Sequence, residues 1–311
     1  MARVFVTRRL PGPALERLTH IHDTTVWPDR LPPTYGQLRE YAAQAEGLLT
    51  LLTDRIDEPL IAASPHLKAI ANYAVGYDNV DIRAAHARGI PVGHTPDVLT
   101  DATADMTFAL LMAAARHLRE GIAAAHEGDW VTWEPGRHLG ADVHGATLGI
   151  IGPGRIGQAV ARRAGGFDMT VITGRRGDHD SLDRLLRRAD FVSLHCPLTP
   201  ETRHLIDREA LAKMKPTAIL INTARGPIVD QVALAAALHT GQIAAAALDV
   251  TDPEPLPQDD PLWQAPHLLI TPHIGSATRT ARERMTEISV ENLLAALDRR
   301  PMPHAVPPPV S

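Results

Sequence analysis

The sequence lacks the features that would set it apart from ordinary globular proteins, such as many cysteines or long apolar runs. Cys196 is the one cysteine in 311 residues, so no disulfide can form within the chain and no oxidising compartment is implied. Apolar runs such as residues 106–115 are shorter than the roughly 20 residues of a membrane-spanning helix. Pro11 and Pro13 interrupt the N-terminal segment before the apolar core of a signal peptide can form.

Charge of one sign is also scarce. The formal net charge of −5 gives no general electrostatic reason to bind nucleic acid or an acidic membrane. The apolar fraction of 44% and the charged fraction of 22% are those of a globular protein, and 311 residues correspond to about two domains. We therefore expect a soluble, cytoplasmic, two-domain protein with neither a nucleic acid nor a membrane as partner.

Short apolar runs alternate with helical stretches along most of the chain, which is typical of α/β domains with parallel, doubly wound sheets. Such runs predict strands that are buried on both faces. The strands are expected at residues 3–7, 48–52, 69–73, 147–151, 169–173, 191–194, 218–222, 246–250 and 268–271. Helices are expected at residues 13–19, 102–118, 155–163 and 280–298.

A glycine-rich loop lies between the strand at 147–151 and the helix at 155–163. It carries Gly152, Gly154 and Gly157 in the pattern G-x-G-x-x-G. The first glycine permits a tight turn, the second lets the backbone approach a pyrophosphate, and the third lets the helix pack closely on the strand. The helix N-terminus adds N–H donors and a positive dipole. This context predicts a dinucleotide site, whereas the alternative is an ordinary turn with incidental glycines.

The end of the next strand bears on which dinucleotide binds. An NAD site usually has an acidic residue there, about 20 positions after the glycines, to bind the ribose hydroxyls. This chain has Arg175 and Arg176 at that place. A guanidinium can bind a 2′-phosphate through paired, charge-assisted hydrogen bonds, so we predict that NADP(H) is preferred and that NAD(H) remains possible. The alternative is that both arginines are solvated surface charges and that Asp178 serves an NAD ribose.

Three loops that follow expected strands carry candidate chemistry. Arg225 follows the strand at 218–222, Glu254 follows the strand at 246–250, and His273 follows the strand at 268–271. Arg225 would bind a substrate carboxylate and polarise the adjacent carbonyl. His273 would exchange a proton with the carbonyl oxygen, and Glu254 would orient the imidazole and favour its charged form. Singly each residue is weak evidence, since the chain has 16 histidines and most histidines are structural.

Together these motifs resemble the D-isomer-specific 2-hydroxyacid dehydrogenase family, and within it the glyoxylate/hydroxypyruvate reductase branch. The resemblance covers nearly the whole chain. The segments that carry it are residues 72–81, 103–111, 148–157, 195–199, 221–226 and 271–275.

The resemblance implies an architecture that the sequence pattern alone does not. A Rossmann dinucleotide-binding domain at 100–281 would be inserted into a smaller, flavodoxin-like substrate domain made of residues 1–99 and 282–311. It also implies a hinge between the domains and a homodimer formed through the nucleotide domain. Trp133 resembles an aromatic residue that a dimer partner contributes to the active site, although a tryptophan that only packs in the dimer is an equal alternative.

The resemblance further assigns positions around the two ligands. Arg225, Glu254 and His273 fall on the catalytic positions, and backbone groups of Val75 and Gly76 fall where the substrate carboxylate binds. Asp249 matches the position that holds the nicotinamide carboxamide. The remaining cofactor positions are Thr103, Arg155, Ile156, Cys196, Pro197, Thr202, Ala224 and Gly275. No residue is assigned as a metal ligand.

The expected activity is the NADPH-dependent reduction of a small 2-keto acid, glyoxylate or hydroxypyruvate, to the D-2-hydroxy acid. The alternatives are a dehydrogenase for lactate or phosphoglycerate, a phosphite or formate relative, and a nucleotide-sensing protein similar to co-repressors of this fold. Two positions depart from the family pattern. Pro153 has no N–H to offer a pyrophosphate, and Asp168 stands where the family often has glycine.

Overall fold

The computed structural model describes residues 1–174 and 179–309, which form two compact units. The first unit comprises Met1–Leu99 and Ala277–Ser311, and the second comprises Thr100–Ser276. The chain thus returns to the first unit at Ala277, before its last helix, rather than at the expected residue 282. The last helix belongs wholly to the first unit for that reason.

The first unit contains one five-stranded parallel sheet in the order β2-β1-β3-β4-β5, which is the flavodoxin-like order. Its strands are β1 (Arg3–Val6), β2 (Asp23–Val26), β3 (Gly47–Leu51), β4 (Ala69–Tyr73) and β5 (Val92–Gly93). Its helices are α1 (Ala14–Ile21), α2 (Tyr35–Gln44), α3 (Glu58–Ala62), α4 (Ile82–Ala87) and α11 (Arg279–Leu297).

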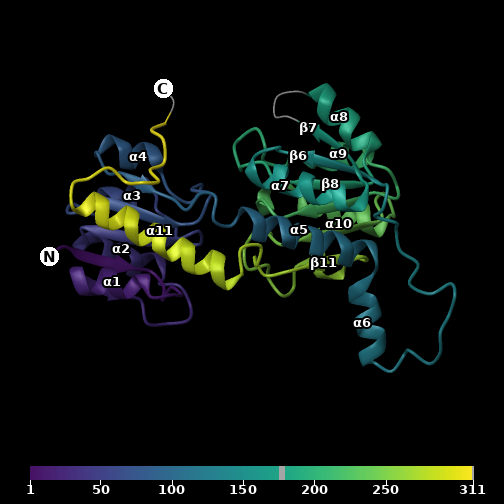
Figure 1. Ribbon diagram of the computed structural model, residues 1–311, viewed down its shortest axis with the longest axis horizontal. Helices are drawn as coiled ribbons and strands as arrows, with labels where there is room; N and C mark the ends of the chain where they lie inside the picture. The colour runs from purple at the N-terminus through teal and green to yellow at the C-terminus, as the bar shows by residue number, and fades with distance from the viewer. Residues whose placement is uncertain (175–178, 310–311) are drawn as a thin grey trace. The chain divides into compact units, whose positions relative to one another are not determined.

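Both faces of this sheet are covered by helices. Buried side chains of α2, α3 and α4, among them Leu38 and Leu60, pack on Leu48 and Ile70 of the sheet. The long helix α11 lies along α1 and contacts β3 and β4 (Figure 1). At Gly47 an added Cβ would lie 3.1 Å from a side-chain carbon of Leu293, so glycine lets α11 approach β3 closely.

The second unit contains a six-stranded parallel sheet in the order β11-β10-β9-β8-β6-β7. Its strands are β6 (Thr147–Ile151), β7 (Thr170–Gly174), β8 (Phe191–Leu194), β9 (Ile219–Asn222), β10 (Ala245–Leu248) and β11 (Leu268–Ile270). Its α-helices are α5 (Thr100–Ala115), α6 (Leu118–His126), α7 (Arg155–Ala164), α8 (His179–Arg188), α9 (Arg208–Lys213) and α10 (Gln231–His239). The α/β class and the parallel, doubly wound arrangement are as predicted.

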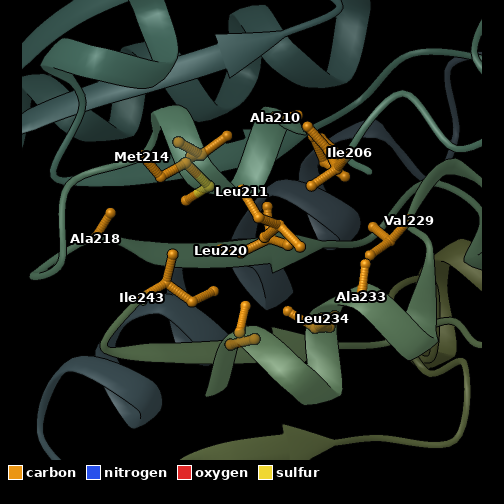
Figure 2. Close-up of a cluster of buried hydrophobic side chains, with 14 of the residues drawn as sticks. Ile206, Ala210, Leu211, Met214, Ala218, Leu220, Val229, Ala233, Leu234 and Ile243 are labelled. Carbon is orange, nitrogen blue, oxygen red and sulfur yellow. The ribbon is translucent and has the colours of Figure 1, made fainter. Parts of the chain in front are cut away.

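Two hydrophobic cores sandwich this second sheet. Helices α5 and α7 cover one face through side chains such as Phe108 and Val160. Helices α8, α9 and α10 cover the other face, where Leu211, Leu220 and Leu234 meet (Figure 2). The inner strands β8, β9 and β10 are therefore buried on both sides, which explains why their sequences are largely apolar, whereas the edge strand β7 is partly exposed.

The helix predicted at 102–118 is two helices. Helix α5 ends at Ala115, His117 takes a left-handed conformation with a φ of 48°, and α6 begins at Leu118. The break falls at Arg116 and His117, so no glycine or proline marks it in the sequence. Helix α6 and the segment that follows it extend away from the sheet of their unit (Figure 1). Within residues 1–174 and 179–309, no helix has both the length and the apolarity needed to cross a bilayer.

Candidate active site

The glycine-rich loop joins β6 to α7, as predicted, and each glycine has a separate steric reason. Gly152 has a φ of +90°, and a Cβ there would lie 2.5 Å from the backbone nitrogen of Cys196. A Cβ at Gly157 would lie 2.5 Å from the carbonyl oxygen of Gly152. At Gly154, the N-cap of α7, a Cβ would meet nothing within 4 Å. Gly152 and Gly157 thus shape the turn, and Gly154 leaves open space at the helix N-terminus. This arrangement fits a pyrophosphate.

The chain switches sides of the sheet at this loop. From β6 it passes to β7 at one side, and β8 then pairs with β6 on the other side. Ligands of open α/β sheets bind outside the carboxyl ends of strands at such a switch point. The backbone of Cys196, which follows β8, lies directly beside Gly152, and Pro197 comes next in the sequence. Arg155 and Ile156 form the first turn of α7 at the same edge.

Thr202 closes the turn after β8 with its side chain. Its hydroxyl donates to the carbonyl oxygen of Pro197 at 2.7 Å and accepts from the backbone N–H of Thr199 at 2.8 Å. The side chain is 1% exposed. Burial raises the pKa of the neighbouring Cys196 thiol to about 11, so the thiol is protonated at neutral pH. Thr202 and Cys196 therefore shape the surface of this turn rather than present reactive groups.

The Arg225 turn follows β9 and is fixed by its own side chains. The Asn222 amide donates to the Arg225 carbonyl oxygen at 2.9 Å, and its oxygen accepts from the Ala224 backbone N–H at 3.0 Å. A Cβ at Gly226 would lie 2.0 Å from the carbonyl oxygen of Thr251. Glycine at 226 thus lets the Arg225 turn pack against the loop that follows β10.

Glu254 and His273 form a direct pair. Nδ1 of His273 lies 2.8 Å from a carboxylate oxygen of Glu254, and both side chains are about one-quarter exposed. The other carboxylate oxygen of Glu254 accepts from the backbone N–H of Thr251 at 3.1 Å. Because an ionised carboxylate only accepts hydrogen bonds, Nδ1 carries the donated proton. This leaves Nε2 as the ring nitrogen that can exchange a proton with a ligand.

Asp249 holds the loop that carries His273. One carboxylate oxygen accepts from the Thr271 hydroxyl at 2.6 Å and the Ile274 N–H at 2.8 Å, and the other accepts from the Gly275 N–H at 2.7 Å. The Asp249 side chain is buried, and its backbone carbonyl accepts from His273 N–H at 2.9 Å. Thr103 of α5 packs beside Gly275, where an added Cβ would lie 3.6 Å from its methyl carbon.

Arg225, Glu254 and His273 thus follow three neighbouring parallel strands, β9, β10 and β11, at one edge of the sheet. Packing at Gly226 and the hydrogen bonds of Thr251 and Asp249 connect the three loops. Thr251 and Asn222 were not predicted as part of the site. Their positions at strand ends, next to the candidate residues in the sequence, are the signal that could have identified them.

Arg175, Arg176 and Asp178 fall outside the described residues. Val75 and Gly76 lie in the first unit after β4, where their carbonyl oxygens accept from His94 Nδ1 at 2.9 Å and the Asn72 amide at 3.0 Å.

Trp133 is 80% exposed in the segment after α6.

Asp168 has a φ of 52°, a left-handed conformation that glycine adopts readily and that aspartate tolerates.

Known proteins resemble this chain along its length. Residues 108–275 match the family model described as D-isomer specific 2-hydroxyacid dehydrogenase, NAD binding domain. A glyoxylate reductase of Korarchaeum cryptofilum is 48% identical over 305 residues, which cover 94% of this chain and 92% of the relative. The crystal structure of a protein from Thermus thermophilus has a TM-score of 0.92 at 51% identity, covering 98% of this chain and all of the other.

A second solved structure carries a ligand pair. It is an NADPH-dependent glyoxylate/hydroxypyruvate reductase from Sinorhizobium meliloti in complex with NADP and malonate, with a TM-score of 0.86 at 31% identity, covering 98% of this chain and 96% of the other. With the matched nucleotide-binding model, this makes the present chain an oxidoreductase with a nicotinamide cofactor. The chain belongs to the D-isomer-specific 2-hydroxyacid dehydrogenase family, in its glyoxylate reductase branch.

Proposed function

We propose that the protein reduces glyoxylate, hydroxypyruvate or both to the D-2-hydroxy acid, with NADPH preferred over NADH. The observation that carries this proposal is the His273–Glu254 pair, with 2.8 Å between Nδ1 and the carboxylate, at the sheet edge that also carries the Arg225 turn. Relatives named glyoxylate reductase at 48% and 46% identity support the choice of substrate.

The proposed roles divide binding from proton transfer. A bound nicotinamide cofactor supplies the hydride. Arg225 binds the carboxylate of the keto acid and polarises the carbonyl beside it. His273 gives the proton at Nε2 to the carbonyl oxygen as negative charge develops there. Glu254 accepts the Nδ1 proton of His273 in a hydrogen bond, so the ring keeps its orientation and Nε2 faces the substrate.

The remaining assignments extend the same proposal. Asp249 positions the His273 loop and would accept from the nicotinamide carboxamide with its remaining lone pairs. Backbone N–H groups of Val75 and Gly76 would bind the substrate carboxylate from the first unit. Thr103, Gly275, Ala224 and the turn from Cys196 to Thr202 would shape the cofactor surface. The dimeric state and the reach of Trp133 into a partner's site belong to the same set of proposals.

The test is a comparison of initial rates. Purified protein is assayed with NADPH and with NADH, each with glyoxylate, hydroxypyruvate and pyruvate. We expect turnover of glyoxylate or hydroxypyruvate, faster with NADPH, and a D-configured product when hydroxypyruvate is the substrate. Tight cofactor binding without turnover of any of the three acids would instead point to another acid substrate or to the nucleotide-sensing alternative.

Arg225→Ala separates substrate binding from cofactor binding. The variant should lose at least about a thousandfold in kcat/KM, because both the carboxylate partner and the polarising charge are removed. Its dissociation constant for NADPH, measured by fluorescence titration, should change less than about threefold. Unchanged turnover in this variant would remove Arg225 from the proposed mechanism.

A further inference from the structure

A second group of ligand-type side chains lies in the second unit, on residues that the proposed mechanism does not use. His117 lies between α5 and α6, Glu120 is in the first turn of α6, and His267 directly precedes β11. One possible ligand atom from each residue lies within 4.8 Å of the other two. The three residues come from segments far apart in the sequence, so the fold and not a local motif brings them together.

The carboxylate of Glu120 stands between the two imidazoles. One oxygen lies 4.0 Å from Nδ1 of His117, and the other lies 3.7 Å from Nδ1 of His267. Both separations are too long for hydrogen bonds. The two rings lie 5.1 Å apart, centroid to centroid, edge to face. The three groups therefore face one another across a gap without forming hydrogen bonds to one another.

The gap has the size of a single ion or water. The hollow that His117, Glu120 and His267 line, together with Arg119 and four alanine or leucine residues, has a volume of about 10 Å³, close to the smallest that holds one water molecule. A tetrahedral zinc ion with bonds of roughly 2.0–2.1 Å needs its ligand atoms roughly 3.3 Å apart. The observed separations, which are all within 4.8 Å, would have to shorten by at most about 1.5 Å, which side-chain rotation can supply.

The backbones that carry these side chains are fixed. The guanidinium of Arg119 donates to the carbonyl oxygen of Leu268, which ties α6 to the start of β11. The carbonyl oxygen of His267 accepts from Ala246 N–H at 3.1 Å, and that of His117 accepts from Gly121 N–H at 2.9 Å. Arg119 also brings a positive charge nearby, which opposes a cation and sets a limit on affinity.

From this geometry we propose that His117, Glu120 and His267 bind one divalent transition-metal ion. Two imidazoles and one carboxylate favour Zn²⁺, Ni²⁺ or Cu²⁺ over Mg²⁺ or Ca²⁺, which prefer all-oxygen sites. Three protein ligands leave a fourth position for water. The bound ion links α6 to β11 and so stabilises the base of the segment that extends from the unit. This proposal rests on none of the assignments made for the reductase site.

The test uses the full-length protein without a histidine tag, after treatment with a chelator. Isothermal titration with Zn²⁺ should show one ion bound per chain at micromolar concentrations. Co²⁺ should give the visible absorption of a four-coordinate site. His267→Gln and Glu120→Gln should each weaken Zn²⁺ binding at least tenfold, since each removes one of three ligands. His126→Gln, an exposed histidine on the same helix outside the cluster, should bind as the unmodified protein does.

Two results would overturn the proposal. One is the absence of stoichiometric Zn²⁺ binding in the unmodified protein, which would leave the cluster as two imidazoles beside a carboxylate. The other is equal Zn²⁺ affinity in the unmodified protein, His267→Gln and Glu120→Gln, which would place the ion elsewhere. Circular dichroism of each variant shows whether it is folded, and the conservative Glu120→Gln change keeps the shape of the side chain.

Discussion

At the scale of single residues, burial controls the ionisation of His195, next to the glycine-rich loop. Its Nε2 lies 2.8 Å from the Ser193 hydroxyl, and its buried Nδ1 has no hydrogen-bond partner among the described residues. Burial without an acidic partner lowers the pKa of His195 to about 4, so the ring is neutral in the folded protein at neutral pH.

The first prediction concerns stability in mild acid. The pKa of His195 is about 4 in the folded protein and about 6.5 in the unfolded chain, so the unfolded chain binds the proton first as the pH falls. Stability is therefore lost from about pH 6.5 down to about pH 4, by roughly 3 kcal/mol in all. The His195→Gln variant lacks this titration. Urea unfolding at pH 7 and pH 4.5 should show a loss that is about 2 kcal/mol smaller in the variant, and equal losses would contradict the burial argument.

The second prediction concerns the choice of cofactor and rests on the sequence alone, since Arg175 lies outside the described residues. Arg175→Asp removes the proposed partner of the 2′-phosphate and introduces a charge that repels it. The ratio of kcat/KM for NADPH over that for NADH should fall at least tenfold. Arg155→Gln is the control, because the proposal gives the side chain at that position no contact with the 2′-phosphate. A variant at position 175 with the original ratio would show that the phosphate is bound by other residues.

At the scale of elements, strands were easier to predict than helix ends. The expected strands at 69–73, 147–151 and 191–194 coincide with β4, β6 and β8, because strands buried on both faces are continuous apolar runs. The division between α5 and α6 was missed, because His117 takes a left-handed conformation although it is not a local helix breaker such as glycine or proline. The grouping of Glu120 with His267 could not be predicted, because the fold brings the two residues together from segments far apart in the sequence.

The candidate site, too, could be predicted only in part. The glycine-rich loop and the three strand ends could be predicted because loops after parallel strands meet at one sheet edge. The contact of Gly226 with Thr251 and the three hydrogen bonds accepted by Asp249 could not, because each depends on the spacing of neighbouring strands.

The third prediction tests that contact between loops. In Gly226→Ala, the added Cβ would lie 2.0 Å from the carbonyl oxygen of Thr251, so one of the two loops must move. We expect the free energy of unfolding to fall by about 1–3 kcal/mol. We also expect a lower kcat, because the Thr251 N–H donates a hydrogen bond to Glu254. Gly121→Ala is the matched control. That glycine lies within α6 with nothing within 4 Å of an added Cβ, so the change should stabilise the protein by up to about 1 kcal/mol. Thermal unfolding and initial rates measure both effects.

At the scale of the whole molecule, the segment after α6 exposes large apolar side chains. Trp130, Val131, Trp133 and Leu139 are each more than 70% exposed in the single chain. Soluble proteins seldom leave such a group in water, and apolar surface of this kind commonly marks an interface. This supports the homodimer that the family resemblance implies.

The fourth prediction is a mass measurement. Light scattering after size exclusion should give twice the chain mass of 33.7 kDa. Replacing both Trp130 and Trp133 by aspartate should shift the protein toward the monomer, because charge at a buried interface is costly. Replacing the exposed Val232 of α10 by aspartate is the control and should leave the mass unchanged. A monomeric mass for the unmodified protein would exclude the dimer.

The path of the chain between the two units also sets the order in which a nascent polypeptide can fold. Residues 1–99 leave the ribosome first, but the face of their sheet that α11 covers stays exposed until Arg279–Leu297 has been synthesised. Residues 100–276 are contiguous and hold both cores of their own sheet, so they can fold while the last part of the chain is still being made. The segment made first is thus the one that finishes last, and its uncovered apolar surface is where chaperones have most to protect during translation.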